Sequence, residues 1–273
     1  MQENKYYQSI LSRRDFIKSA AAGAALTLSP SLAFAEQLTI KEGRTELIVP
    51  HNGKNLSFLH PAYGPDTYAN VKSQIEQAGL TPPTMGQIAS LVHSAFDSND
   101  RYSGEIKNIM KNRWLWAYTQ SNYQPKPIDG VFVYDEKDEN TFKDLSGSEL
   151  EKMLGNRQEH GVVYSDNGLL RFVPFGYQVG EMIPLKLAKN PYVIALAGEE
   201  AEKLAEVADK HKDKPYLWSF KSVDQPLTRV SILVSDWGLG HGLGVDGSSH
   251  GNVRGGHGFG VLKETGEAGR EKK

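Results

Sequence analysis

The chain of 273 residues contains no cysteine. This absence excludes disulfide bonds, a thiolate nucleophile, an iron–sulfur cluster and a covalently attached c-type haem. Folded stability must therefore rest on the size of the hydrophobic core. The length is sufficient for one large domain or two small ones.

A surplus of basic residues is also missing. The chain holds 31 Lys and Arg against 33 Asp and Glu, which gives a formal net charge of −2. If residues 1–35 are removed, 27 basic and 31 acidic residues remain, and the charge becomes −4. Because basic side chains are what hold a phosphate backbone, nucleic acid is not expected as a partner.

No hydrophobic run is long enough to span a bilayer, so the mature protein is expected to have no membrane span. The stretch from Ala20 to Leu28 is short, mildly apolar and rich in alanine. It stands between the basic segment S-R-R-D-F-I-K at residues 12–18 and the small-residue site A-F-A at residues 33–35. This order of basic, apolar and small-residue segments is typical of an export signal.

The basic segment resembles the twin-arginine consensus S-R-R-x-F-L-K, with Ile17 in place of leucine. The resemblance implies that the twin-arginine (Tat) translocase is a partner during export and that the cargo crosses the membrane already folded. It also implies an extracytoplasmic location, periplasmic or secreted. The residues predicted to carry the signal are Arg13, Arg14, Phe16, Lys18, Ala33 and Ala35.

The rest of the sequence mixes helix and strand patterns without a regular alternation. This predicts an α+β fold in which N-terminal helices are followed by short mixed or antiparallel strands. Thr84 and Gln87 have the spacing of a helix capping box, and the apolar run Tyr192–Ala197 is expected to be a buried strand. Alternation should place residues 114, 116 and 118 on one face of a strand, and residues 216, 218 and 220 likewise. Helices are expected at 68–78, 85–96, from 103, 148–154 and 199–211, and strands at 38–40, 46–49, 130–134, 162–164, 169–175 and 229–234.

Three parts are predicted along the chain. Residues 1–35 are the signal peptide, and residues 36–262 form a single α+β domain, with an internal division near 140–160. Residues 263–273 contain seven charges and are expected to be a disordered charged tail.

The segment 236–260 is unusual because it contains ten glycines and three histidines, each followed by glycine. A helix is excluded, since each glycine costs close to 1 kcal/mol in a helix interior. One interpretation is a divalent metal site. Neutral imidazoles and a carboxylate suit such an ion, although spacings of nine and seven match no known ligand motif. The candidate metal ligands are His241, His250, His257 and Asp246.

Other interpretations of the same segment remain open. Residues 247–251 fit G-x-S-x-G, but a nucleophile elbow needs a strand before it and a helix after it. Residues 242–246 are like part of a glycine-rich calcium repeat, of which one copy cannot stack. Glycine-rich loops can also form a rim that presents polar side chains to a ligand, or simply tight turns that join short terminal strands, the last at 259–262. The residues predicted for a ligand-binding rim are Trp237, Asp246, Asn252 and Arg254.

The order of these pieces resembles C-type-lectin-like domains of bacterial secreted proteins, over residues 80–262. The resemblance implies that fold for the mature chain. The frequent disulfide cysteines and the W-N-D calcium signature of that superfamily are missing here. The matching residues are Pro83-Thr84 with Ile88, Trp116, Trp218-Ser219 and Gly258-Phe259-Gly260-Val261.

Together these features predict an exported protein that binds a polar small molecule or an envelope component. No catalytic residue is assigned, and the balance of the sequence is against an enzyme. The alternatives are a metal-dependent hydrolase that uses the glycine- and histidine-rich segment, and a cell-surface structural or adhesive protein.

Overall fold

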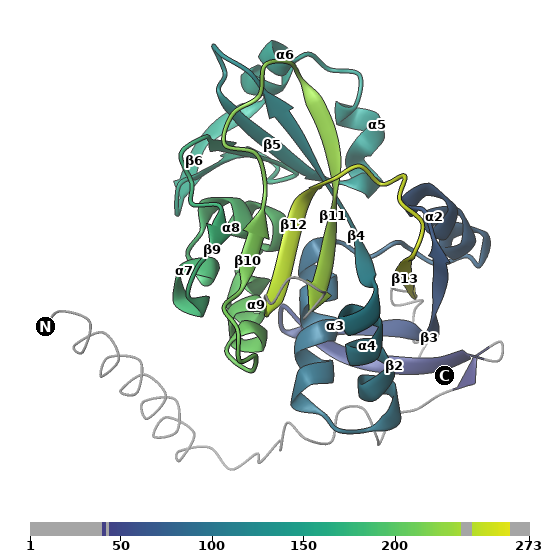
Figure 1. The fold of residues 1–273 in the computed structure, drawn as a ribbon. Helices are drawn as coiled ribbons and strands as arrows, with labels where there is room; N and C mark the ends of the chain where they lie inside the picture. Colours follow the sequence, from purple (N-terminus) through teal and green to yellow (C-terminus); the bar gives the residue numbers. More distant parts are fainter. Residues whose placement is uncertain (1–39, 42–43, 236–241, 263–273) are drawn as a thin grey trace, which may run out of the picture. The chain divides into compact units, whose positions relative to one another are not determined.

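The computed structural model describes residues 40–41, 44–235 and 242–262. Within these residues, strands and helices are mixed, which confirms the α+β class (Figure 1). The strands are β1 (Ile40–Lys41), β2 (Arg44–His51), β3 (Lys54–Asp66), β4 (Trp114–Gln124), β5 (Gly130–Asp135), β6 (Leu154–Glu159), β7 (Val162–Ser165), β8 (Leu170–Pro174), β9 (Gly180–Glu181), β10 (Tyr216–Trp218), β11 (Leu227–Ser235), β12 (Leu243–Ser249) and β13 (Gly256–Val261). The α-helices are α2 (Tyr68–Gln77), α3 (Met85–Asp97), α4 (Arg101–Asn112), α5 (Glu139–Phe142), α6 (Gly147–Lys152), α7 (Pro184–Ala188), α8 (Pro191–Ala197) and α9 (Ala201–Ala208), with 3₁₀ turns at η3 (Glu136–Asp138) and η4 (Gly198–Glu200).

Strand β4 is the centre of the sheet. One of its edges pairs with β11 in antiparallel fashion. Two strands share the other edge of β4. Strand β13 pairs in parallel with the first two residues of β4, and β5 pairs in antiparallel fashion with residues 119–124 of β4. The main path through the sheet is β1-β2-β3-β13-β4-β11-β12-β10-β9, and β5 continues through β8 and β7 to β6.

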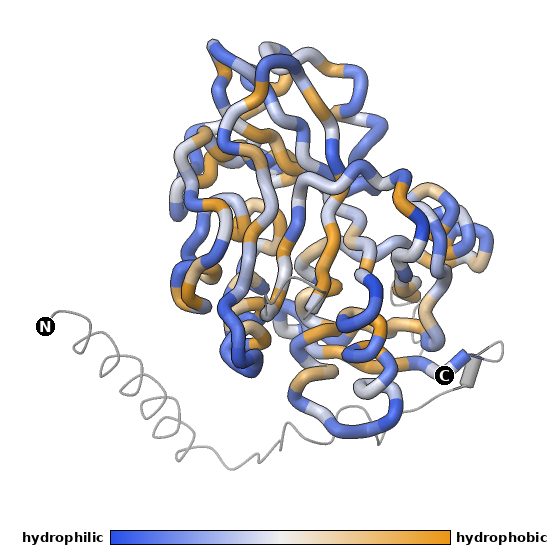
Figure 2. Tube along the Cα trace, in the orientation of Figure 1, coloured by the Kyte–Doolittle hydropathy of each residue, from blue (hydrophilic) through white to orange (hydrophobic). Residues whose placement is uncertain are grey.

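The two faces of β4 belong to different parts of the core. Trp114, Trp116 and Tyr118 pack with helix α2, which confirms the predicted alternation. Leu115 and Ala117 point to the opposite face, where α3, α8 and α9 cover the sheet. Figure 2 shows hydrophobic residues along the central strands, while many outer turns are hydrophilic.

The matching prediction for residues 216, 218 and 220 holds only in part. The rings of Tyr216 and Trp218 lie together, with centroids 4.5 Å apart. Strand β10 ends at Trp218, so the alternation stops there. Phe220 instead packs edge-on against Tyr123, at 4.9 Å between centroids.

Glycines in β12 and β13 make room for large rings. A Cβ atom on Gly244 would overlap the indole of Trp218, and one on Gly256 would overlap Trp114 and Trp116. Of the interpretations left open for this segment, short terminal strands joined by turns agree with the described residues: the strands are β12 and β13, and residues 250–255 join them. Gly244 and Gly256 are needed at their strand positions because neighbouring aromatic side chains leave no room for a Cβ atom there.

Local sequence signals are confirmed at the helix starts and at the first hairpin. The side chain of Thr84 accepts a hydrogen bond from the backbone N–H of Gln87, whose own side chain accepts one from the backbone N–H of Thr84. Asn52 and Gly53 have φ values of 47° and 73°, as a tight turn between β2 and β3 requires. The predicted strands near 130, 162, 169 and 229 are β5, β7, β8 and β11.

The predicted strand at Tyr192–Ala197 is wrong, because this run is helix α8. Pro191 occupies the first helical turn, and the side chain of Asn190 accepts a hydrogen bond from the backbone N–H of Tyr192. A short apolar run fits a buried strand and a buried helix equally, so the cap residues decide the outcome. The helix expected at 199–211 is shorter and splits into η4 and α9.

Candidate binding site

The residues predicted for export lie outside the described part of the chain. This applies to Arg13, Arg14, Phe16, Lys18, Ala33 and Ala35, and also to the tail 263–273. Of the residues predicted for ligand or metal binding, Trp237 and His241 are likewise outside it. The division near 140–160 stays a prediction.

Asp246 lies on β12, opposite Trp218 of β10 and Ile232 of β11. Its Oδ1 atom accepts hydrogen bonds from the backbone N–H and the hydroxyl of Ser248, at 2.6 Å and 2.7 Å. No described residue donates a hydrogen bond to Oδ2. Burial raises the pKa of Asp246, and the hydrogen bonds from Ser248 and the nearby charge of His250 only partly oppose this effect.

The rings beside Asp246 belong to the same face of the sheet. Trp218 lies over Gly244, the residue two positions before Asp246 on that face. Tyr216 and Trp218 are half-buried. The face therefore joins a pair of aromatic rings to a carboxylate.

The loop 250–255 follows β12 and carries exposed side chains. Its base is fixed, because the backbone N–H of Tyr68 donates a hydrogen bond to the carbonyl of Gly251 at 2.9 Å. Beyond this anchor, Asn252, Val253 and Arg254 are exposed, with 54% of the Val253 surface accessible. We call Tyr216, Trp218, Asp246 and the loop 250–255 the β12 face.

The structure brings only some of the predicted residues together. The charge of His250 acts to lower the pKa of Asp246. In contrast, the Nε atom of Arg254 lies 3.8 Å from Oδ1 of Asp66 on β3. His257 is on β13, where burial and the charge of Arg113 lower its pKa. Among the described residues, no group of three His, Asp or Glu side chains is arranged to hold a metal ion.

Ser249, the serine of the G-x-S-x-G match, is the last residue of β12. A loop and strand β13 follow it, whereas a nucleophile elbow requires a helix at this position. The segment therefore does not have the geometry of a serine hydrolase elbow.

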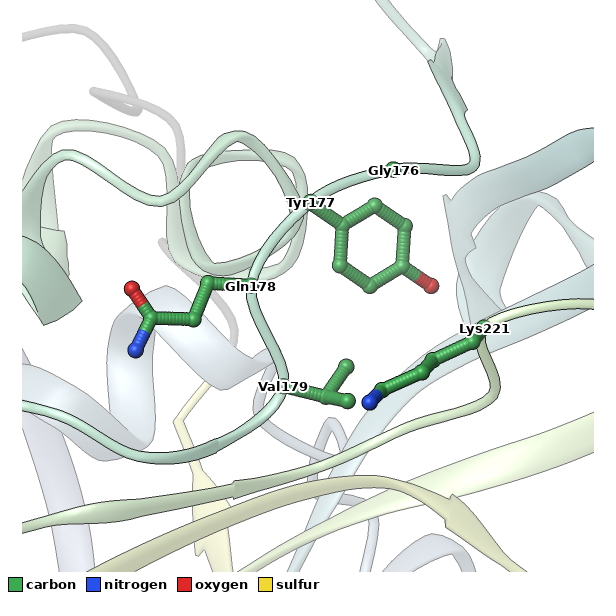
Figure 3. A pocket seen from close by; sticks show the side chains of 5 residues that line it. All are labelled: Gly176, Tyr177, Gln178, Val179 and Lys221. Atoms are coloured by element: carbon green, nitrogen blue, oxygen red, sulfur yellow. The ribbon is translucent and has the colours of Figure 1, made fainter.

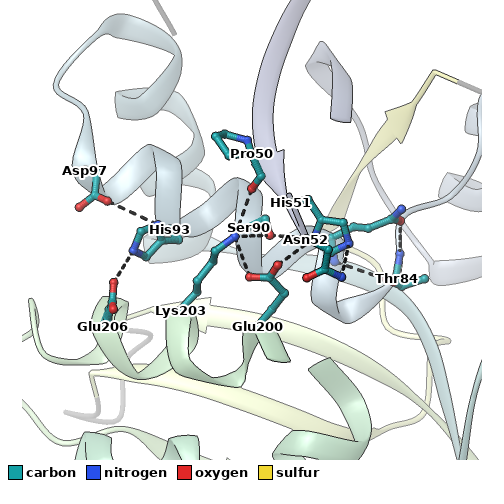
Figure 4. A network of polar contacts seen from close by, with 11 residues as sticks. Pro50, His51, Asn52, Thr84, Ser90, His93, Asp97, Glu200, Lys203 and Glu206 are labelled. Atoms are coloured by element: carbon teal, nitrogen blue, oxygen red, sulfur yellow. Dashed lines mark hydrogen bonds and ion pairs between the residues drawn. The ribbon is translucent and has the colours of Figure 1, made fainter. Parts of the chain in front are cut away.

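A closed polar cluster, missed by the sequence analysis, joins the end of β2 to α3, η4 and α9 (Figure 4). Lys203 donates to the Ser90 hydroxyl at 3.0 Å and lies 2.7 Å from Oε2 of Glu200. His51 Nδ1 lies 3.1 Å from Oε1 of Glu200. Burial alone would raise the pKa of Glu200, but the hydrogen bonds from His51 and Lys203 outweigh it and bring the pKa to about 2.

The cluster contains a serine, a histidine and a glutamate, yet it is not a hydrolase triad. In a triad one ring nitrogen faces the serine and the other faces the acid. Here the same Nδ1 atom of His51 lies 2.9 Å from Ser90 Oγ and 3.1 Å from Glu200. Ser90 is completely buried, so no substrate can reach its hydroxyl.

A second closed cluster joins α2 to η3. The Tyr68 hydroxyl donates to Glu136 at 2.5 Å, and Lys72 lies 2.7 Å from the other carboxylate oxygen. Burial raises the pKa of Glu136, although Lys72 and Tyr68 oppose the rise. Because both partners come from the same helix, the cluster fixes α2 against the end of β5.

Comparison with known proteins accounts for the N-terminus. Residues 11–30 match the family model of the TAT (twin-arginine translocation) pathway signal sequence. The protein is exported across the membrane by the Tat pathway. None of the described helices is long and apolar enough to cross a membrane.

The mature chain has a remote structural match to a solved C-type lectin fold protein from Nanoarchaeota, described under "Accommodation of massive sequence variation in Nanoarchaeota by the C-type lectin fold". The two chains are 12% identical, the match covers 74% of this chain and 96% of the other, and the TM-score is 0.43. No curated protein sequence matches the chain.

Proposed function

We propose that the exported protein binds a polar ligand or an envelope component through the β12 face. The observation that carries the proposal is the loop 250–255, whose base is fixed while its tip exposes an apolar side chain between two polar ones. Asn252 and Arg254 supply hydrogen bonds, and Val253 supplies contact area.

The chemistry of the face favours a ligand that donates hydrogen bonds. Asp246 Oδ2 is available as an acceptor, because Ser248 uses only Oδ1. The neighbouring rings of Tyr216 and Trp218 offer flat apolar area. A carboxylate beside aromatic rings suits a polar molecule that has both hydroxyl or amine groups and an apolar side.

The described polar clusters support a binding function better than a catalytic one. The acids at Glu200 and Glu136 are enclosed and already paired with lysines. Their partners come from the protein itself, so both clusters hold helices in place. On the β12 face, by contrast, Ser248 is the only described residue that donates hydrogen bonds to the acid, and the loop side chains of residues 252–254 are exposed.

The test uses purified mature protein and two probes, a set of neutral and acidic oligosaccharides and isolated cell-envelope fragments. We expect wild type to be retained by at least one probe. The double variant Asn252→Ala/Arg254→Ala should weaken that retention by about tenfold, equal to ~1.4 kcal/mol. Val253→Ser should weaken it less, because only contact area is lost.

Matched controls separate the site from general surface effects. Arg157→Ala removes an exposed arginine that is paired with Glu159 on β6. Ile183→Ser removes another exposed apolar side chain, just before α7. Both controls should leave retention unchanged. Equal losses from the controls and the loop variants, or no retention of wild type by either probe, would contradict the proposal.

A further inference from the structure

A hollow of about 310 Å³ lies at the far edge of the sheet, near the short strands β9 and β10. Four of its lining residues, Gly176, Tyr177, Gln178 and Val179, follow β8, and the fifth, Lys221, follows β10. Figure 3 shows these side chains around the hollow. The volume is at the lower end of the range for small-molecule sites.

This pocket is separate from the β12 face. Tyr177 packs with the core cluster that contains Tyr123 and Tyr192, on the side of the sheet covered by α3, α8 and α9. Asp246 and Trp218 belong to the opposite face. The pocket therefore represents a second site, and its occupant does not depend on the function proposed above.

The wall formed by Tyr177 is fixed before any ligand arrives. Its hydroxyl lies 2.8 Å from Ser219 Oγ and donates to the carbonyl of Phe220 at 3.1 Å. Its ring is stacked on Tyr192, with 5.0 Å between centroids and 15° between planes. Burial raises the pKa of Tyr177, so the phenol stays neutral and acts as a wall. A ring held in this way loses little entropy when a flat ligand packs against it.

The hydroxyl network continues behind this wall. Ser219 Oγ lies 3.0 Å from the Tyr123 hydroxyl, which lies 2.6 Å from the Tyr192 hydroxyl. Both tyrosines also donate to the carbonyl of Gly247, at 2.9 Å and 3.1 Å. The polar atoms behind the pocket therefore have hydrogen-bond partners within the protein. The charge of the pocket comes from Lys221.

Among the described residues that line the pocket, Lys221 is the only charged one. Within the described residues it makes no ion pair with a carboxylate. Glu181 of the neighbouring strand β9 is already paired with Lys214, at 3.0 Å. A second cation is Arg229, whose guanidinium carbon lies 5.9 Å from the ring centroid of Phe220. The backbone carbonyl of Phe220 accepts the hydrogen bond from the Tyr177 hydroxyl. The edge therefore offers positive charge beside an aromatic and an aliphatic wall.

We propose that this pocket binds a small organic anion, in which a flat or apolar body carries one carboxylate. The carboxylate pairs with Lys221, and the body lies against Tyr177 and Val179. The size of the hollow limits the body to about one or two rings.

The test is a titration of purified mature protein with benzoate, and with benzylamine as a ligand of the same shape and opposite charge. Backbone amide NMR signals of residues 176–179 are the readout. We expect benzoate to shift these signals with a dissociation constant of about 1 mM, and benzylamine to leave them in place. Binding of both ligands with equal affinity would overturn the role of Lys221.

Two lysine variants make the test specific. Lys221→Gln should weaken benzoate binding by about tenfold. Lys214→Gln removes a neighbouring lysine that is already paired with Glu181, and it should leave the affinity unchanged. Because both lysines are exposed, both variants should fold. The proposal is overturned if benzoate does not shift the signals of residues 176–179, or if the two variants weaken binding equally.

Discussion

Two carboxylates in different parts of the fold, Glu200 and Asp246, differ in the partners that surround them. Glu200 faces a lysine and a histidine, and its pKa falls to about 2. Asp246 faces the hydroxyl and backbone N–H of Ser248, and burial raises its pKa. The first charge is balanced inside the protein, so it contributes to folding. The second is balanced only in part, so it remains available to a ligand that brings hydrogen-bond donors.

The largest expected effect on stability comes from replacing Glu200, and it would sharpen this comparison most. Glu200→Ala leaves Lys203 and His51 without their acid, so we expect it to lower the free energy of unfolding by about 3 kcal/mol. For a domain of this size the melting temperature should fall by roughly 6–12 °C. Thermal unfolding followed by circular dichroism measures the change.

The matched control for this prediction is Glu206→Ala. Glu206 also lies near a histidine, 2.7 Å from His93 Nε2, but its side chain is 62% exposed. An exposed pair of this kind contributes at most about 1 kcal/mol. Similar losses from the two variants would show that the cluster around Glu200 has no special role.

Acid should remove the contribution of Glu200 over a defined range of pH. The pKa is near 4.5 in the unfolded chain and about 2 in the folded protein. Stability from this group is therefore complete above pH 4.5 and declines as the pH falls toward 2. Urea unfolding at several pH values should show a smaller decline for Glu200→Gln than for wild type, and equal slopes would contradict the assignment.

Asp246→Asn should have the smallest effect on stability and still impair binding. The amide keeps Oδ1 as an acceptor for Ser248 and removes a charge whose folded pKa is raised. Such a charge opposes folding once the pH exceeds the pKa of the unfolded chain, so the melting temperature at pH 7 should stay equal or rise. Retention by oligosaccharides or envelope fragments should fall. A marked loss of stability would mean that Asp246 is structural, like Glu200.

Sequence patterns were sufficient where structure depends on neighbours along the chain. The capping box at Thr84 and Gln87, the turn at Asn52-Gly53 and the alternation of Trp114, Trp116 and Tyr118 are of this kind. The twin-arginine signal is also a local pattern. The run Tyr192–Ala197 failed because its periodicity was too short to separate helix from strand.

The remaining features depend on residues that are distant in sequence. Glycine is needed at position 244 of β12 because the indole of Trp218, 26 positions earlier in the sequence, occupies the space of a Cβ atom. The cluster at Glu200 combines three segments, and only the spacing of Glu200 and Lys203 on adjoining helical turns could have indicated it. No sequence pattern indicated the pocket at Tyr177 and Lys221, because the residues of its two walls follow different strands.

Strand β13, the last of the described strands, lies between β3 and β4. Residues 256–261 must therefore leave the ribosome before the early hairpin of β2 and β3 can acquire this neighbour. Until then the edge of β3 that pairs with β13 stays open. This late completion of the sheet is compatible with a translocase that accepts finished folds.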